Sequence, residues 1–280
     1  MARRASLLRR LLRRRMTVVS LVVLAAVLGS AILAPWIAPY DPQRMDIIHR
    51  LAAPSARHWF GTDDFGRDVL SRVLYGARLS VSAGTLVVLV SVAAGTVLGL
   101  LAGYVRRLDT VLMRFTDALM ALPDILLAIA LMAALGPSLL DVVLALGTVY
   151  TPRVARLVRG ATLVLRRLPF VEAAEVLGAG DARIVWVHLV PNLVSPLIVQ
   201  ATFIFAAAIL TEAALSFLGA GIPPTTPSWG NMIAGAQQYF DQAQWLILTP
   251  GIAILLTVLA LQIVGDALRD VLDPRLRRLT

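Results

Sequence analysis

Six apolar runs of bilayer length divide this chain of 280 residues, and they constrain its fold more than any other feature. A helix needs about 20 mainly apolar residues to cross the hydrocarbon core of a bilayer. Charged residues make up only 15% of the chain, whereas a soluble domain has roughly a quarter. We therefore expect an all-α integral membrane protein with about six transmembrane helices. Their expected ranges are 16–36, 79–104, 118–135, 139–157, 194–218 and 245–265.

The first apolar run follows a basic segment, 1–15, that holds seven arginines. A secretory signal peptide has the same order of charged and apolar residues, but its apolar part is shorter and ends at a small-residue cleavage site. No such site stands out before Pro35. We interpret 16–36 as an uncleaved first transmembrane helix.

The positions of the arginines predict the orientation of the chain. All 26 basic residues are arginines, and 20 of them fall on one side of the membrane if the N-terminus is cytoplasmic. The remaining six lie between 44 and 78, and the loop 219–244 has none. The positive-inside rule therefore places the N- and C-termini in the cytoplasm. Because the charge lies in short runs between apolar stretches, we expect it to face the lipid bilayer and not nucleic acid.

The same runs predict the organisation of the chain. The segments are a basic cytoplasmic N-terminus (1–15), the first helix (16–36), an extracytoplasmic loop (37–78), a core transmembrane domain (79–267) and a cytoplasmic C-terminal tail (268–280). In the outer loop, residues 64–78 have the spacing of an amphipathic helix lying on the membrane surface, although a solvated helix has the same periodicity. Gly95, Gly99 and Gly103 recur every four residues, which predicts close packing of another helix.

The longest cytoplasmic segment, about 159–192, has the signals of two short helices. Pro169 suits the first position of a helix, and Gly178 is a natural stop. Asp181 can cap a second helix, which we expect to end near Pro191. Two helices joined by a Gly-Ala-Gly bend would form a rigid elbow suited to docking a partner protein. A surface helix resting on lipid headgroups is the alternative.

The composition excludes several kinds of chemistry. Without cysteine the chain has no disulfide and no thiolate site. Without lysine it cannot form a Walker P-loop, so any ATP must be bound by another subunit. The histidines, His49, His58 and His188, are too far apart to share a metal, and motifs such as GxSxG and HExxH are missing. We expect no enzymatic activity, and no metal or cofactor site.

Four polar residues within the expected spans are candidates for a polar pathway or gate: Glu212, Gln200, Gln262 and Asp124. A carboxylate is costly in lipid, so Glu212 should face the interior of the bundle or water. It is either a gating group near the outer mouth or a structural hydrogen-bonding group near Trp229. The two glutamines either line a pathway or join neighbouring helices.

The elbow reads EAAEVLGAGDARIVWVHLVPN and resembles the EAA loop of ABC importer permeases. The motif positions are held by Glu172, Ala173, Ala174, Gly178 and Pro191. In the family, the first elbow helix is the coupling helix that contacts an ATPase. The resemblance implies that Glu172 makes a polar contact there, that the two alanines let the helix seat closely, and that Gly178 allows the bend.

Three further stretches resemble the second, C-type permease subunit of the dipeptide/oligopeptide/nickel family: 60–78, 212–232 and 265–276. This resemblance implies the type I ABC importer transmembrane-domain fold in a bacterial or archaeal cytoplasmic (inner) membrane. It also implies three kinds of partner: a second homologous permease, two ABC ATPase subunits that bind ATP and Mg²⁺, and an extracytoplasmic solute-binding protein.

For the solute, the resemblance implies dipeptides or oligopeptides, with nickel, glutathione or another small solute as alternatives. A stand-alone secondary transporter is the rival hypothesis. Such a transporter is expected to show an inverted internal repeat with broken helices, and none is convincing in this sequence.

Overall fold

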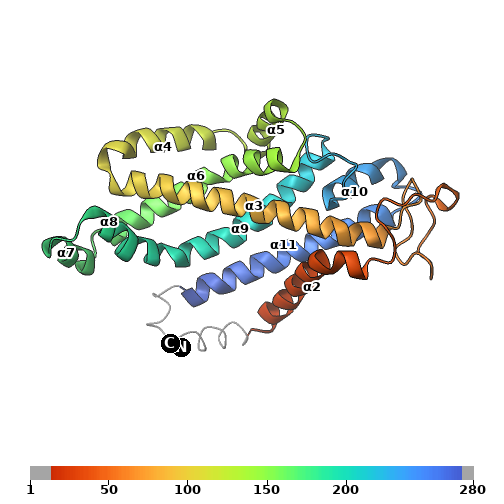
Figure 1. Ribbon diagram of the computed structural model, residues 1–280, viewed down its shortest axis with the longest axis horizontal. Helices are drawn as coiled ribbons and strands as arrows, with labels where there is room; N and C mark the ends of the chain where they lie inside the picture. The colour runs from red at the N-terminus through yellow and green to blue at the C-terminus, as the bar shows by residue number, and fades with distance from the viewer. Residues whose placement is uncertain (1–13, 273–280) are drawn as a thin grey trace.

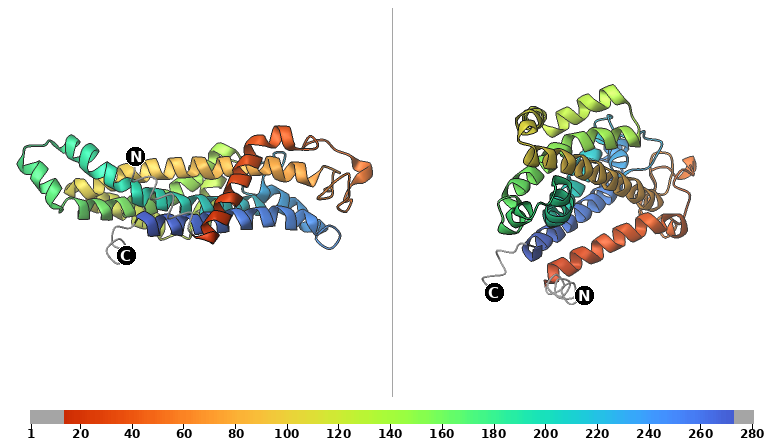
Figure 2. Two further views of the ribbon diagram at one scale, coloured as in Figure 1. Left: turned by 90° about the horizontal axis from the view of Figure 1, so that it is seen from below. Right: turned by 60° about the vertical axis from the view of Figure 1, so that its left-hand side comes forward.

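The computed structural model describes residues 14–272 and shows an elongated bundle of helices (Figures 1 and 2). Four long helices run along the bundle: α3 (Val69–Tyr104), α6 (Leu139–Leu165), α9 (Val190–Phe217) and α11 (Trp245–Leu272). A fifth, α2 (Arg15–Ile37), crosses them obliquely (Figure 2). The shorter α-helices are α4 (Arg106–Met120), α5 (Asp124–Leu135), α7 (Pro169–Val176), α8 (Asp181–Arg183) and α10 (Trp229–Ala236). Single turns are η1 (Ile47–His49), η2 (Ile184–Leu189) and η3 (Gln237–Tyr239). Residues 14–272 contain no named strand, so the all-α expectation is confirmed.

Four helical stretches of the described chain are long and apolar enough to cross a membrane, and the bent pair α4–α5 would be a fifth. The four are Arg15–Ile37, Val69–Tyr104, Asp181–Phe217 and Trp245–Leu272. The remaining expected span, 139–157, corresponds to α6, which has 27 residues but carries Arg153, Arg156 and Arg159 in its second half. α6 is therefore long enough to cross a membrane, but three arginines are unusual in a transmembrane helix.

The closest helix packing in the bundle joins α3 to α6 at the three regularly spaced glycines. A Cβ atom at Gly95 would lie 2.4 Å from Val154 Cβ, and one at Gly99 would lie 2.5 Å from the Ala155 carbonyl oxygen. Small residues allow such approach in lipid, where dispersion contacts drive helix association. The prediction of a packing groove at these glycines is confirmed.

The prediction of a separate surface helix at 64–78 is wrong. Residues 64–68 are irregular, and α3 starts at Val69 and continues unbroken to Tyr104. Asp68 is the N-cap, and its Oδ2 accepts hydrogen bonds from Ser71 N at 2.8 Å and from Ser71 Oγ at 2.7 Å. An N-cap aspartate satisfies amide groups that the first helical turn leaves unpaired. The face assigned to water is instead buried, because Ser71 and Arg72 are only 0% and 4% exposed.

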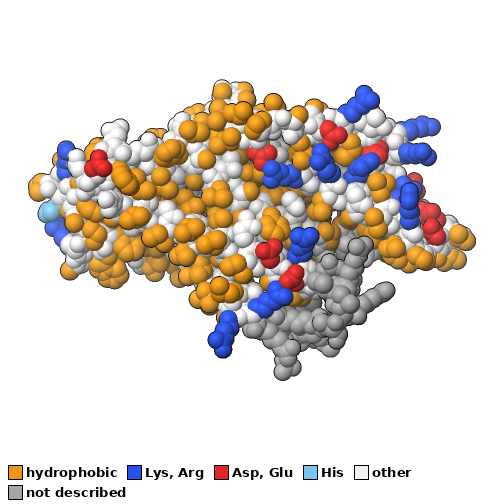
Figure 3. Space-filling model, turned by 180° about the vertical axis from the view of Figure 1, so that it is seen from behind, with side chains coloured by type: hydrophobic (Ala, Val, Ile, Leu, Met, Phe, Trp, Pro, Cys, Tyr) orange, Lys and Arg blue, Asp and Glu red, His pale blue; other side chains and the backbone are white. Residues whose placement is uncertain are grey.

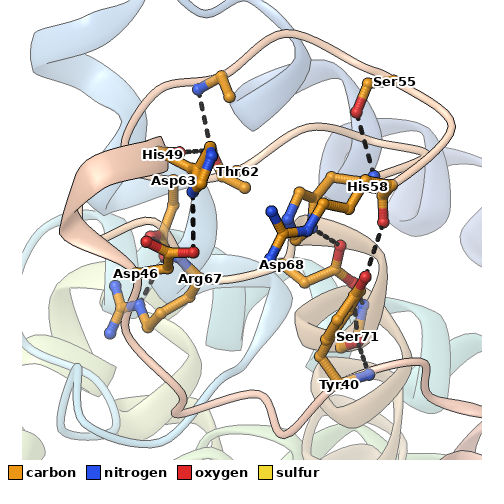
Figure 4. A network of polar contacts seen from close by, with 12 residues as sticks. Tyr40, Asp46, His49, Ser55, His58, Thr62, Asp63, Arg67, Asp68 and Ser71 are labelled. Carbon is orange, nitrogen blue, oxygen red and sulfur yellow. Dashed lines mark hydrogen bonds and ion pairs between the residues drawn. The ribbon is translucent and has the colours of Figure 1, made fainter.

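The outer loop 38–68 folds back on this cap as a compact polar network (Figure 4). His58 Nδ1 lies 2.9 Å from Asp68 Oδ1, and the His58 ring packs on Tyr40. Asp63 accepts from Arg67 Nε at 2.7 Å. At the surface of the loop, the hydrogen bond from His49 lowers the pKa of Asp46 below its ordinary value. These contacts fix the loop against the start of α3.

The expected span 118–135 is not one straight helix. α4 ends at Met120, α5 begins at Asp124, and the two helix axes differ by 93°. Pro123 cannot donate a helical hydrogen bond, and it disfavours helical backbone at the preceding residue. The chain therefore breaks at 121–123.

The N-terminal end of α2 and the C-terminal end of α11 lie together, because Arg14 Nη1 is 2.7 Å from Asp270 Oδ2. The elbow α7–α8 projects from one end of the bundle, whereas α10 and the outer loop lie at the opposite end (Figure 1). Hydrophobic side chains cover the middle of the face in Figure 3, and most of the charged side chains visible there gather toward one end and along the lower edge. This distribution suits a molecule surrounded by lipid at its middle.

Candidate functional site

The elbow begins with α7, which is anchored to the bundle through one side. Pro169 stands at the start of α7, as predicted from its sequence position. Val171 is completely buried and packs with Ile184 and Leu189, against partly buried side chains at the inner ends of α3 and α6. The opposite side of α7 has no such cover within the described chain, so one face of the helix is fixed and the other is free for a partner.

Gly178 ends α7 through a left-handed residue, with φ of +81°. The amide of Ala179 donates to the Ala174 carbonyl at 3.0 Å, and the amide of Gly178 donates to the Glu175 carbonyl at 2.9 Å. This pair of bonds closes the helix in the manner of a Schellman motif, in which glycine avoids the steric cost of the left-handed conformation. The prediction that the helix stops at Gly178 is confirmed.

The end of α7 carries two exposed apolar side chains that sequence reasoning missed. Val176 and Leu177 are each 87% exposed, and Glu172 and Ala173 are also exposed, whereas Ala174 is half-buried. These two adjacent side chains form a small exposed apolar surface at the tip of the elbow. The sequence pattern EVLG held this signal, because both residues fall just before the helix stop, where the chain turns away from the bundle.

Two predictions for the second half of the elbow are wrong. Asp181 does not cap a helix: Gly180 is the N-cap, and Asp181 Oδ1 instead accepts a hydrogen bond from the Tyr104 hydroxyl at 2.7 Å. The second helix does not end near Pro191, since the helical stretch 181–217 is continuous through the π-helical turn η2 into α9. Pro191 therefore lies inside this continuous stretch, directly after the π-helical turn, where it cannot donate a helical hydrogen bond.

Tyr104 links this elbow to the end of α3. Besides the bond to Asp181, its carbonyl accepts from Arg166 Nη1 at 2.8 Å, and the Arg166 guanidinium lies 4.6 Å from the centre of its ring. The elbow is thus held by Val171 on one side and by Tyr104 on the other. A displacement of α7 therefore has a direct mechanical route to α3 and α6.

Asp124 belongs to a row of three ion pairs that join α6 to the bent pair α4–α5. Arg153 pairs with Asp124 at 2.5 Å, Arg156 with Asp117 at 2.7 Å, and Arg159 with Asp109 at 2.5 Å. The three arginines are spaced at i, i+3 and i+6, so they lie along one side of α6. All six side chains are between 24% and 60% exposed. Since exposed charge is costly against lipid, this side of α6 is expected to meet water or protein.

Glu212 lies in α9 and is 1% exposed. Its Oε1 accepts from Ser216 Oγ at 3.0 Å and its Oε2 from Ser80 Oγ at 3.4 Å, while Ser80 Oγ accepts in turn from the Trp229 amide at 3.4 Å. These bonds tie α9 to α3 and to the start of α10. Within this chain, Glu212 therefore connects elements near the outer end of the bundle and does not face an open cavity.

We predict that Glu212→Leu lowers the free energy of unfolding by about 1–3 kcal/mol, because the buried hydroxyls of Ser80 and Ser216 lose their acceptor. Thermal unfolding in detergent measures this change. Glu212→Gln is the matched control, since it retains an oxygen acceptor and nearly the same volume, and it should unfold close to the parent protein. Equal losses in both variants would contradict a hydrogen-bonding role.

The two glutamines have different surroundings. Gln200 lines an open cavity of about 550 Å³ between the inner parts of α6, α9 and α11. Gln262, in α11, is half-buried and is not among the residues that line it. The structure therefore brings Gln200, but not Gln262, Glu212 or Asp124, to this cavity.

The apolar bundle and its anchored elbow define a membrane protein with a structured element that projects from one end of the bundle. Residues 95–278 match the family described as binding-protein-dependent transport system inner membrane component, and residues 4–54 match the N-terminal TM domain of oligopeptide transport permease C. The chain belongs to this family and is a C-type permease of a binding-protein-dependent importer.

Curated relatives cover nearly the whole chain. A putative peptide transport system permease protein of Brucella suis is 51% identical over 269 residues, covering 96% of this chain and 91% of the relative. The di/tripeptide transport system permease protein of Pseudomonas aeruginosa is 45% identical, covering 92% and 87%. A probable D,D-dipeptide transport system permease protein of Escherichia coli is 42% identical, covering 93% and 88%.

Proposed function

We propose that this chain is the transmembrane permease subunit of an ATP-driven importer for di- or oligopeptides, in which it forms half of the translocation pathway. The names of the three relatives above support peptides as the solute class. The proposed coupling to ATP hydrolysis rests on one observation. The elbow is anchored to the bundle at Val171 and Tyr104, and its apolar side chains Val176 and Leu177 are exposed.

The remaining subunits are part of the same proposal. ATP and Mg²⁺ are bound by two separate ATPase subunits, and this chain is a non-catalytic transport subunit, which agrees with its having no lysine for a P-loop. A second homologous permease completes the pathway, and an extracytoplasmic binding protein delivers the solute. We place six spans in the cytoplasmic membrane of a prokaryote, with both termini inside, on the distribution of the arginines.

In this proposal α7 is the coupling helix, and Val176 and Leu177 enter an apolar cleft of an ATPase. Glu172 adds a polar contact, and the small side chains of Ala173 and Ala174 allow close seating. Closure of the ATPases on ATP displaces the elbow, and the link from Asp181 to Tyr104 carries the displacement into the bundle. A conformational change of this kind requires that ATP favours one of two arrangements of the same rigid element.

The elbow surface is tested by the double variant Val176→Asp/Leu177→Asp. Burying one such side chain contributes about 1.5–3 kcal/mol, and each 1.4 kcal/mol is tenfold in affinity. We therefore expect ATPase subunits to copurify at least about tenfold less well, without loss of membrane insertion. The control Val176→Met/Leu177→Met keeps the surface apolar and should retain the ATPases. Undiminished copurification of the aspartate variant would contradict the docking role.

Reconstitution tests the whole proposal. Vesicles that contain both permeases, the ATPases and the binding protein should accumulate a radiolabelled dipeptide only when ATP is supplied. Accumulation by vesicles containing this chain alone would favour a stand-alone carrier. Uptake of nickel or glutathione, but of no peptide, would reassign the solute.

A further inference from the structure

The open cavity at the inner half of the bundle has a lining that is unusual for a membrane helix. Its residues are Leu157, Pro191, Asn192, Ser195, Pro196, Val199, Gln200, Phe203, Arg269 and Leu272. Polar groups from α9 and α11 face a volume of about 550 Å³, which lies in the range of 300–1,000 Å³ typical of small-molecule sites. Polar side chains in a span face protein or water, so this cavity is a wet surface within the bundle.

The backbone of α9 adds an acceptor to the same cavity. Pro196 lies inside the helix and has no amide hydrogen, so the carbonyl of Asn192, four residues earlier, lacks its helical donor. The Asn192 side chain is already engaged, since its Nδ2 donates to the His188 carbonyl at 2.7 Å. Asn192 therefore offers carbonyl oxygens, and Gln200 offers both an amide donor and a carbonyl acceptor. These groups match the N–H and C=O of a peptide bond.

One cationic group lies at the rim of this cavity. Arg269, in the last turn of α11, lines it, and the neighbouring Asp270 is paired with Arg14 at 2.7 Å. Among residues 14–272, the lining contains no Asp, Glu, His or Cys. A divalent metal ion prefers such ligands, so this lining disfavours nickel, whereas a guanidinium binds a carboxylate readily. The remaining lining includes the apolar side chains of Leu157, Val199 and Phe203, which form no hydrogen bonds and therefore do not select a particular solute side chain.

We propose that this cavity is a low-affinity station for the peptide on its way inward, with the terminal carboxylate at Arg269 and the main-chain amide at Gln200 and Asn192. The proposal rests on the peptide-import function above and adds a binding site within this subunit. It accounts for a polar stripe on α9 that neither the elbow nor the helix packing uses.

Because this chain has no cysteine, the inference can be tested with single-cysteine variants of it in the assembled transporter, with labelling measured on this subunit after the subunits are separated. Ser195→Cys and Val199→Cys, both in the lining of the cavity, are each labelled with a maleimide, with and without a dipeptide. We expect the dipeptide to slow labelling several-fold at both positions. The same dipeptide with an amidated C-terminus should protect much less, and adding Arg269→Gln should abolish the protection, whereas Arg269→Lys should restore part of it.

Thr225→Cys, in an exposed part of the loop between α9 and α10, is the control and should be labelled at the same rate throughout. The inference is overturned if the dipeptide leaves labelling of both cavity positions unchanged while the same preparation, with binding protein and ATP, imports that dipeptide. Equal protection at Thr225→Cys would overturn it as well. Failure of peptide import itself would count against the proposed function instead, so the two failures are distinguishable.

Discussion

Gly99→Val is expected to lower the free energy of unfolding by about 3 kcal/mol, because overpacking a tight helix contact costs about 1–3 kcal/mol and sometimes more. The first added carbon would lie 2.5 Å from the Ala155 carbonyl oxygen and 2.6 Å from Val158 Cβ. A backbone atom cannot rotate away, so α3 and α6 must separate along their length. Thermal unfolding in detergent and the yield of monodisperse protein measure the effect.

Gly251→Val is the matched control for this packing contact. Gly251 also lies inside a spanning helix, α11, but a Cβ atom there would meet nothing within 4 Å. Valine is slightly better than glycine in a helix interior, so the control should unfold at or near the parent temperature. If both variants lose the same stability, helix propensity and not the α3–α6 contact sets the cost.

Local patterns in the sequence predicted much of the fold. The apolar runs correspond to long helices, and Gly178 predicted the end of α7. The spacing of Gly95, Gly99 and Gly103 predicted the close packing of another helix, which the structure identifies as α6. Each of these features depends on residues within a few turns of one another, whose physical preference is the same in most contexts. The break at Pro123 carried an equally local signal, which was outweighed by the apolar length of 118–135.

Local sequence patterns could not predict the contacts between distant segments of the chain. The partners of Asp124 and Asp181 lie 29 and 77 residues away, so no local spacing indicates them. The surface helix at 64–78 failed for the same reason: its polar side is covered by the outer loop, which makes that side part of the interior. Val176 and Leu177 were overlooked because an apolar pair in a short helix is usually part of the core. Only the geometry of the elbow shows that Val171 is buried while Val176 and Leu177 are exposed.

Gly178→Val is expected to reduce ATP-driven peptide uptake by about tenfold or more while leaving the transmembrane bundle intact. A left-handed conformation costs a non-glycine residue about 1–2 kcal/mol, and 1.4 kcal/mol corresponds to a factor of ten in a population. Gly178 has φ of +81°, and a Cβ atom added there would meet nothing within 4 Å, so the substitution strains the backbone without a clash. Relief of that strain breaks the two bonds that close α7 and turns the end of the helix away from its docking geometry.

Gly180→Val separates backbone strain from bulk at the elbow. Gly180 also has nothing within 4 Å of an added Cβ, but its φ of −71° is one that valine adopts freely. The comparison measures uptake in vesicles together with ATP hydrolysis by the assembled transporter. Gly178→Val should hydrolyse ATP with little uptake, whereas Gly180→Val should keep both activities close to those of the parent. Because the two glycines flank a single alanine, equal uptake in both variants would mean that the left-handed stop of α7 does not set the coupling geometry.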